Sequence, residues 1–78
     1  MPEGLPSSEQ IDERFRALAR ASAVALSLSG AASDQIRSDI ANRMARTIAK
    51  EFPDEPETLT RLAVVVREAI DETLAELM

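Results

Sequence analysis

Residues 7–30 read SSEQIDERFRALARASAVALSLSG, and their pattern predicts a long amphipathic helix. Ser7 and Gln10 have the spacing of a capping box, and Gly30 suits the left-handed position that follows many helices. Between these signals, small or apolar side chains recur every three or four residues. This predicted core face consists of Ile11, Phe15, Leu18, Ser22 and Leu26. We therefore expect a helix over residues 8–29.

The same segment carries a second stripe of uncharged residues, and no charged residue occurs from Ala21 to Ser33. The stripe has spacings of four, three and four and consists of Ala17, Ala21, Val24 and Leu28. At about 100° per residue, it lies roughly 100–140° from the core face, which indicates an interface with a second copy or a partner helix. The alternative is that the alanines only favour helix formation, and that Val24 and Leu28 are isolated exposed residues.

A second helix is expected over residues 34–52. Ser33 is its expected cap, and Pro53 ends it because the residue before a proline is disfavoured in helical conformation. Its apolar residues form one broad face, consisting of Ile36, Ile40, Ala41, Met44, Ala45, Ile48 and Phe52.

A third helix is expected over residues 55–77, with Asp54 as its cap, Glu57 as the reciprocal partner and Pro56 in the first turn. Its apolar face consists of Leu59, Leu62, Val66, Ile70, Thr73, Leu74 and Leu77. Helices of this length joined by short connections pack as antiparallel neighbours. The predicted fold is all-α: a three-helix antiparallel bundle over residues 7–78, completed by self-association or a partner, after a disordered lead-in of residues 1–6.

The composition narrows the possible chemistry. The chain has 78 residues and contains no Cys, His or Tyr and a single lysine, Lys50. Disulfides and thiolate or imidazole metal sites are therefore excluded, and most catalytic side chains are missing, so we expect no enzyme activity, no cofactor and no metal. Because so short a chain buries only about 60–65% of its unfolded surface, stability is marginal and oligomerisation is the remaining source of support.

The net charge of −5 is concentrated in the last third of the chain. Residues 1–30 sum to −1, residues 31–53 to +1 and residues 54–78 to −5. The third helix is expected to present an acidic outer side made of Glu68, Asp71, Glu72 and Glu76. This side is either a solubilising face or a surface that docks on a basic partner protein.

The basic residues of the second expected helix suggest an alternative function. Leu26 to Ile40 has the outline of a helix-turn-helix with Gly30 in the turn, which would make the chain a nucleic-acid-binding protein. The candidate contacts are Arg37, Arg43, Arg46 and Lys50. Asp39 lies in the same arc and can pair with Arg43, so a solvated, salt-bridged face is the favoured interpretation, and nucleic acid is not the expected partner.

No apolar run approaches the ~20 residues that span a bilayer, and the sequence Met-Pro-Glu-Gly-Leu-Pro lacks the basic start of a signal peptide. We therefore expect a cytoplasmic protein without a membrane partner. The favoured hypothesis is a small acidic protein–protein interaction or regulatory module, either homo-oligomeric or bound to a protein partner.

Overall fold

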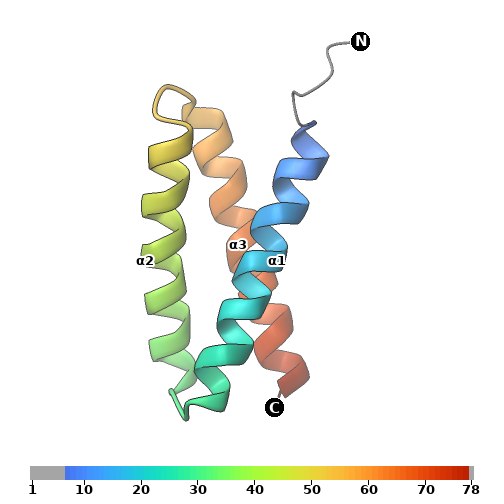
Figure 1. Cartoon of the computed structure of the whole chain (residues 1–78), viewed down its shortest axis with the longest axis vertical. Helices are drawn as coiled ribbons and strands as arrows, with labels where there is room; N and C mark the ends of the chain where they lie inside the picture. Colours follow the sequence, from blue (N-terminus) through green and yellow to red (C-terminus); the bar gives the residue numbers. More distant parts are fainter. Residues whose placement is uncertain (1–6, 78) are drawn as a thin grey trace.

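A computed structural model of the chain describes residues 7–77. These residues form three helices: α1 (Ser8–Leu28), α2 (Ser33–Glu51) and α3 (Pro56–Leu77). Successive helices run in opposite directions alongside one another: in the view of Figure 1, α1 and α3 run downwards and α2 runs upwards. The predicted three-helix antiparallel bundle is confirmed, and each helix boundary lies within one residue of its expected position. The predicted lead-in, residues 1–6, lies outside the described residues.

Both ends of α1 follow the signals in the sequence. The Ser7 backbone N–H donates to Gln10 Oε1 (3.0 Å), and the Gln10 N–H donates to Ser7 Oγ (3.2 Å), which completes the capping box. At the other end Gly30 has φ +87°, a left-handed conformation that glycine adopts without steric cost. The N–H of Ala31 then reaches back to the Leu26 carbonyl (3.1 Å), as in a Schellman motif.

The expected caps of α2 and α3 are each wrong by one residue. Ser33 is the first helical residue of α2, because Ala32 already has the extended backbone of a cap (φ −73°, ψ 153°). The third helix begins at Pro56, so Glu55 takes the position before the first helical residue, and Asp54 lies in the preceding turn. Proline explains this shift, since its fixed φ and missing N–H suit the first position of a helix.

The core face of α1 is rotated from its predicted position. Phe15, Ala19 and Ala23 are completely buried, whereas Leu18 is 43% exposed, so the assignment of Leu18 to the core is wrong. Ala19 and Ala23 share a side of α1 with Asp12, whose carboxylate pairs with Arg61 of α3 at 3.1 Å. The rotation turns the alanines towards α3, where small side chains let the two helices approach closely, and α1 packs more extensively against α3 than against α2.

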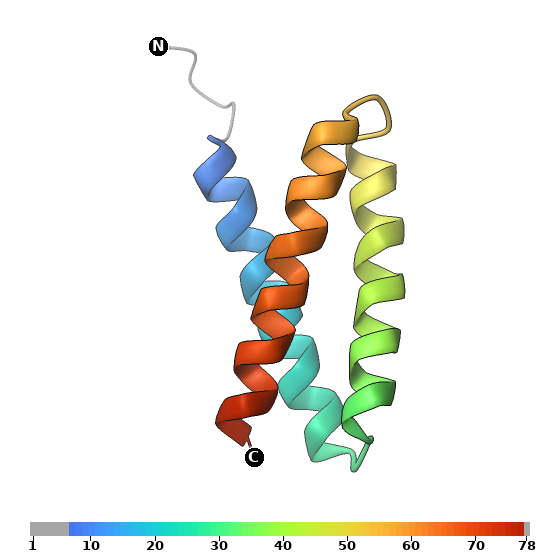
Figure 2. The same ribbon diagram turned by 180° about the vertical axis from the view of Figure 1, so that it is seen from behind.

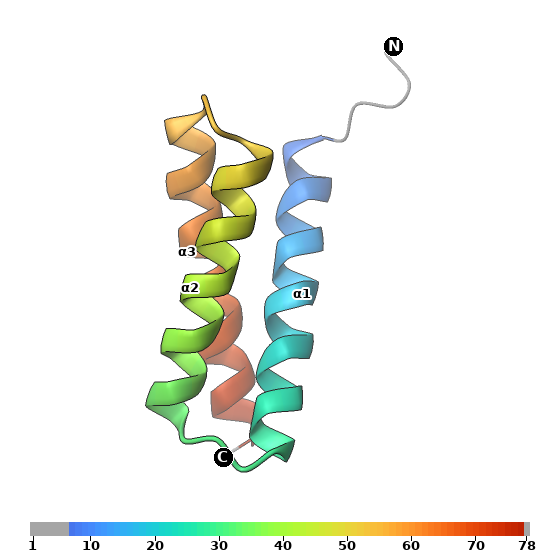
Figure 3. The same ribbon diagram turned by 60° about the vertical axis from the view of Figure 1, so that its left-hand side comes forward.

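The third helix contributes the largest share of the core, and Figures 2 and 3 show it lying beside both other helices. Its one buried polar side chain, Thr73, donates its hydroxyl to the Ala69 carbonyl (2.8 Å), so the hydroxyl is satisfied. The second helix buries only a narrow stripe of Ile36, Ile40 and Ile48. Two members of its predicted broad face, Ala41 and Ala45, are exposed instead.

Candidate functional site

The predicted stripe on α1 is exposed along its whole length. Ala17 and Ala21 are exposed, as are Val24 (38%) and Leu28 (84%). Sequence analysis missed two neighbours on the same side of the helix, the exposed Ala25 and the misassigned Leu18. We call these six residues the α1 face: Ala17, Leu18, Ala21, Val24, Ala25 and Leu28. A run of exposed, uncharged side chains on one helix is the type of patch that marks interaction sites.

The α1 face borders α2. Arg14 of α1 pairs with Glu51 of α2 at 2.9 Å, which shows the side of α1 that faces α2. Ala21 and Ala25 follow Arg14 by seven and eleven residues and therefore lie within about 20° of that direction. By contrast, Leu28 lies about 180° around the helix from the buried Ala19. The α1 face therefore points away from the core, on the side of α2.

The basic residues of α2 do not form one surface. Arg37 extends from α2 to Asp71 of α3 and forms an ion pair with it. Arg43 pairs with Asp39 one turn earlier (3.4 Å), as the salt-bridged interpretation expected. Arg37 lies about 120° around α2 from Arg43, so the four candidate nucleic-acid contacts are divided between two sides of the helix.

Arg46 and Lys50 are the remaining two candidate contacts. Both are exposed, and within residues 7–77 neither has an ion-pair partner. Both lie within about 60° of Arg43 around α2. The helices α1 and α2 run antiparallel along their length (Figure 3), whereas the helices of a helix-turn-helix cross at about 90–120°. The connection through Gly30 therefore lacks the geometry of that motif.

The acidic residues of α3 are all exposed, but most of them bind neighbouring helices. Arg20 of α1 contacts Glu72 (3.5 Å) and Glu76 (2.9 Å). Asp71 belongs to the pair with α2 described above. Of the four predicted docking residues, only Glu68 has no ion pair among the described residues. These contacts neutralise much of the predicted docking face, and each exposed pair contributes at most about 1 kcal/mol to stability.

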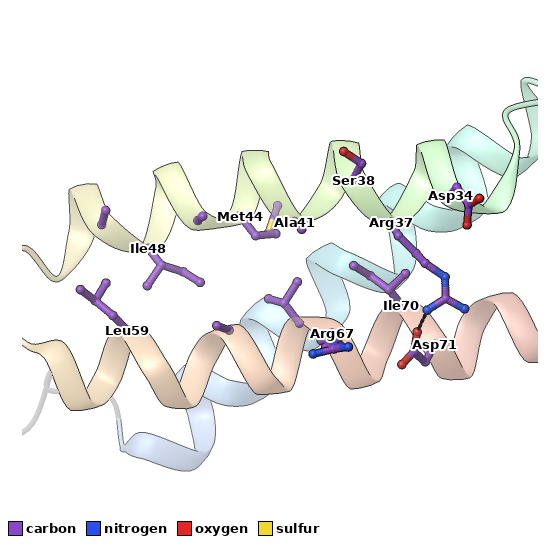
Figure 4. A pocket seen from close by; sticks show the side chains of 14 residues that line it. Asp34, Arg37, Ser38, Ala41, Met44, Ile48, Leu59, Arg67, Ile70 and Asp71 are labelled. Carbon is purple, nitrogen blue, oxygen red and sulfur yellow. Dashed lines mark hydrogen bonds and ion pairs between the residues drawn. The ribbon is translucent and has the colours of Figure 1, made fainter.

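An open apolar groove of about 710 Å³ lies between α2 and α3 (Figure 4). The wall supplied by α2 is a row of exposed alanines: Ala41, Ala45 and Ala49. The groove is also lined by larger apolar residues: Met44, Ile48, Leu59, Val66 and Ile70. We call this surface the α2–α3 groove. Sequence analysis missed it because alanines at a helical spacing fit equally well in a core, where Ala41 and Ala45 were expected.

Charged side chains mark one half of the α2–α3 groove. The ion pair between Arg37 and Asp71 spans the groove near the start of α2 (Figure 4). Arg67 of α3 and Asp34 of α2 also line it, and neither has an ion-pair partner within the described part of the chain. The other half, around Ile48 and Leu59, is apolar. The groove can therefore bind an apolar surface and position charges at one end.

Over residues 7–77, no group of three or more acidic side chains is placed to hold a metal ion. The same residues include no helix that is both long and apolar enough to cross a lipid bilayer. Comparisons with known protein families, with curated proteins and with solved structures found no match. The chemistry available at the two surfaces is apolar burial and ion pairing, which are the forces of macromolecular binding.

Proposed function

We propose that this protein is a non-enzymatic protein–protein interaction or regulatory module that self-associates or binds a partner protein through the α1 face. The observation that carries the proposal is the exposure of this face. Val24 and Leu28 stand among alanines on a continuous uncharged side of α1, and no other described helix covers them. Small residues beside larger ones allow another helix to approach closely and to receive the larger side chains.

The energy available from the α1 face indicates the strength of the interaction. Full burial of one large aliphatic side chain contributes about 1.5–3 kcal/mol. Scaled by the exposed fractions of Leu18 (43%), Val24 (38%) and Leu28 (84%), covering these three gives about 2–5 kcal/mol per copy. Association costs about 4–15 kcal/mol in lost freedom, so this face on its own supports weak binding that needs further contacts.

The acidic outer side of α3 is the second part of the proposal. Glu68 is available to pair with a basic partner. Glu72 and Glu76 are exposed and share Arg20 as their ion-pair partner, so that side of the bundle keeps a negative charge. Such charges raise the rate of encounter with a basic surface more than they raise affinity. The expected partner of this side is therefore a basic protein surface.

The test is the mass of the full chain in solution, measured by light scattering at tens of micromolar. We expect a mass above the 8.5 kDa of one chain. Val24→Glu should return it to the monomer mass, because a carboxylate in a covered apolar interface is strongly unfavourable. Asn42→Glu is the control, since Asn42 is exposed on α2 and belongs to neither the α1 face, the α2–α3 groove nor the acidic side of α3. At concentrations where the protein is monomeric, the free energy of unfolding of Val24→Glu should be close to that of wild type.

The opposite outcome has two parts. A wild-type mass near 8.5 kDa, combined with equal capture of binding partners from lysate by wild type and Val24→Glu, would reject the α1 face as an interaction surface.

A further inference from the structure

One half of the α2–α3 groove is entirely apolar. Its walls are the lining residues from Ala41 to Ala49 on α2 and from Leu59 to Val66 on α3, none of which is charged. At 1.5 Å per residue, each wall is about 10–12 Å long. The alanines of the α2 wall are exposed and leave this half open to solvent. The whole groove, at about 710 Å³ with few polar groups, has the size and character of a small-molecule site.

Arg67 lies at the inner end of the apolar half. Arg37 of α2 pairs with Asp71 of α3, and the two helices run antiparallel. One turn further along α2, Ala41 is therefore level with Arg67. Figure 4 shows Arg67 between the apolar half and that ion pair. The side chain of Arg67 is exposed, lines the groove and forms no ion pair within residues 7–77. The apolar half therefore ends at a guanidinium group that is available to bind an anion.

The two carboxylates that line the groove do not occupy Arg67. Asp71 is held by Arg37. Asp34 lies in the first turn of α2, seven residues before Ala41, which is about 10 Å along the helix axis. That distance exceeds the Debye length of about 8 Å in physiological buffer, so Asp34 repels an anion at Arg67 only weakly. At the end of its apolar half, the groove is therefore complementary to a negative charge.

We infer that the α2–α3 groove binds a small anionic amphiphile, an alkyl chain that ends in a carboxylate. The chain lies along the apolar half, and Arg67 pairs with the carboxylate, whose two oxygens match the paired N–H donors of a guanidinium group. An extended chain advances about 1.2 Å per bond, so about ten carbon atoms fill a wall of this length. The site is separate from the α1 face, none of whose residues line the groove, and the inference does not depend on self-association.

The experiment titrates decanoate into the isotopically labelled full chain, below the concentration at which decanoate forms micelles. Amide chemical shifts in NMR spectra locate the binding site and give the dissociation constant. We expect saturable shifts on both walls of the groove, at Ala45, Ala63 and Arg67, and no comparable shift at Val24 of the α1 face. Circular dichroism verifies that the helical fold is retained.

Two comparisons among ligands separate the apolar part of the site from the charged part. From butyrate to decanoate, each added methylene that the groove covers should tighten binding by about two- to fourfold. The gain should stop beyond about ten carbon atoms, where the apolar half ends. Decylamine matches decanoate in length but is a cation at neutral pH. It should bind about tenfold more weakly or worse, because its ammonium group meets Arg67.

Variants of the full chain test the same two parts. Arg67→Gln should weaken decanoate binding about tenfold, whereas decanol, which is neutral, should bind this variant as it binds wild type. Arg46→Gln is the matched control, because Arg46 is also exposed and without an ion pair within residues 7–77 but does not line the groove. Ala45→Glu should abolish binding by placing a carboxylate in the apolar half. Ala75→Glu, an exposed position outside the groove, should leave binding unchanged.

Three results would overturn the inference. Without saturable shifts, the groove does not bind an alkyl carboxylate, and shifts confined to the α1 face would place the ligand on the wrong surface. If decylamine binds as tightly as decanoate, or Arg67→Gln binds decanoate like wild type, the ligand is not selected by its negative charge. None of these results changes the light-scattering test of the α1 face, so the two proposals fail separately.

Discussion

Replacing Ala19 by Leu tests the orientation of α1, on which the position of the α1 face depends. Ala19 has no exposed surface, and it lies on the side of α1 that packs against α3. The three added carbon atoms have no free space, and such overpacking costs about 1–3 kcal/mol. A chain of this length has a free energy of unfolding of about 4–12 kcal/mol. A cost near 2 kcal/mol lowers Tm by roughly 8–16 °C for a domain of this size.

The assay is thermal unfolding followed by circular dichroism, with all proteins at one concentration. Ala75→Leu is the matched control, because Ala75 is exposed and the substitution should be neutral within about 0.5 kcal/mol. Leu18→Ala is the reciprocal test and should cost about 1 kcal/mol, far less than the 2–5 kcal/mol of a fully buried leucine. Equal Tm values for Ala19→Leu and Ala75→Leu, or a large loss for Leu18→Ala, would refute the observed rotation of α1.

Two further predictions concern the connection after α1 and the basic side of α2. Gly30→Ala should destabilise the fold by about 1 kcal/mol in urea unfolding, because φ +87° is unfavourable for alanine, and an unchanged midpoint would contradict the left-handed turn. Duplex DNA should not bind at physiological salt in a fluorescence anisotropy titration, since Arg37 and Arg43 are held in ion pairs. Micromolar, salt-sensitive binding that Arg46→Ala/Lys50→Ala abolishes would instead support the nucleic-acid function.

Local signals made the helices predictable from the sequence. The capping box at Ser7, the glycine at position 30 and the proline at position 53 each act through the backbone of adjacent residues, so their effects do not depend on the rest of the fold. The prediction erred at Ser33 and Asp54, where a neighbouring residue could take the cap position equally well. Boundaries read from the sequence therefore hold here to within one residue.

Burial of the alanines could not be predicted in the same way. Ala19 is completely buried, and Ala41 and Ala45 are exposed, although all three lie in helical patterns of apolar residues. Alanine is small enough for a core and favourable on a helix surface, so its own sequence context does not distinguish the two. The position of the neighbouring helix decides whether an alanine is buried or exposed. This position depends on the packing of larger side chains such as Phe15.

The ion pairs between helices also could not be predicted from the sequence. Arg37 and Asp71 are 34 residues apart, and Arg20 and Glu76 are 56 residues apart. Their contacts depend on the register and rotation of two helices, which no local pattern specifies. The sequence therefore predicted an acidic side on the third helix, but it did not predict that Asp71 pairs with Arg37 or that Glu72 and Glu76 pair with Arg20. Four of the six residues of the α1 face were predictable, because a helical stripe beside thirteen consecutive uncharged residues is a local feature, whereas Leu18 and Ala25 were missed.

The mass of the wild-type chain across a concentration series tests the central claim most directly. Sedimentation equilibrium from micromolar to hundreds of micromolar measures it without any substitution. Self-association through the α1 face predicts a weight-average mass that rises above 8.5 kDa as concentration increases. A mass of 8.5 kDa at every concentration would contradict it and leave Val24 and Leu28 as ordinary surface residues of a monomer.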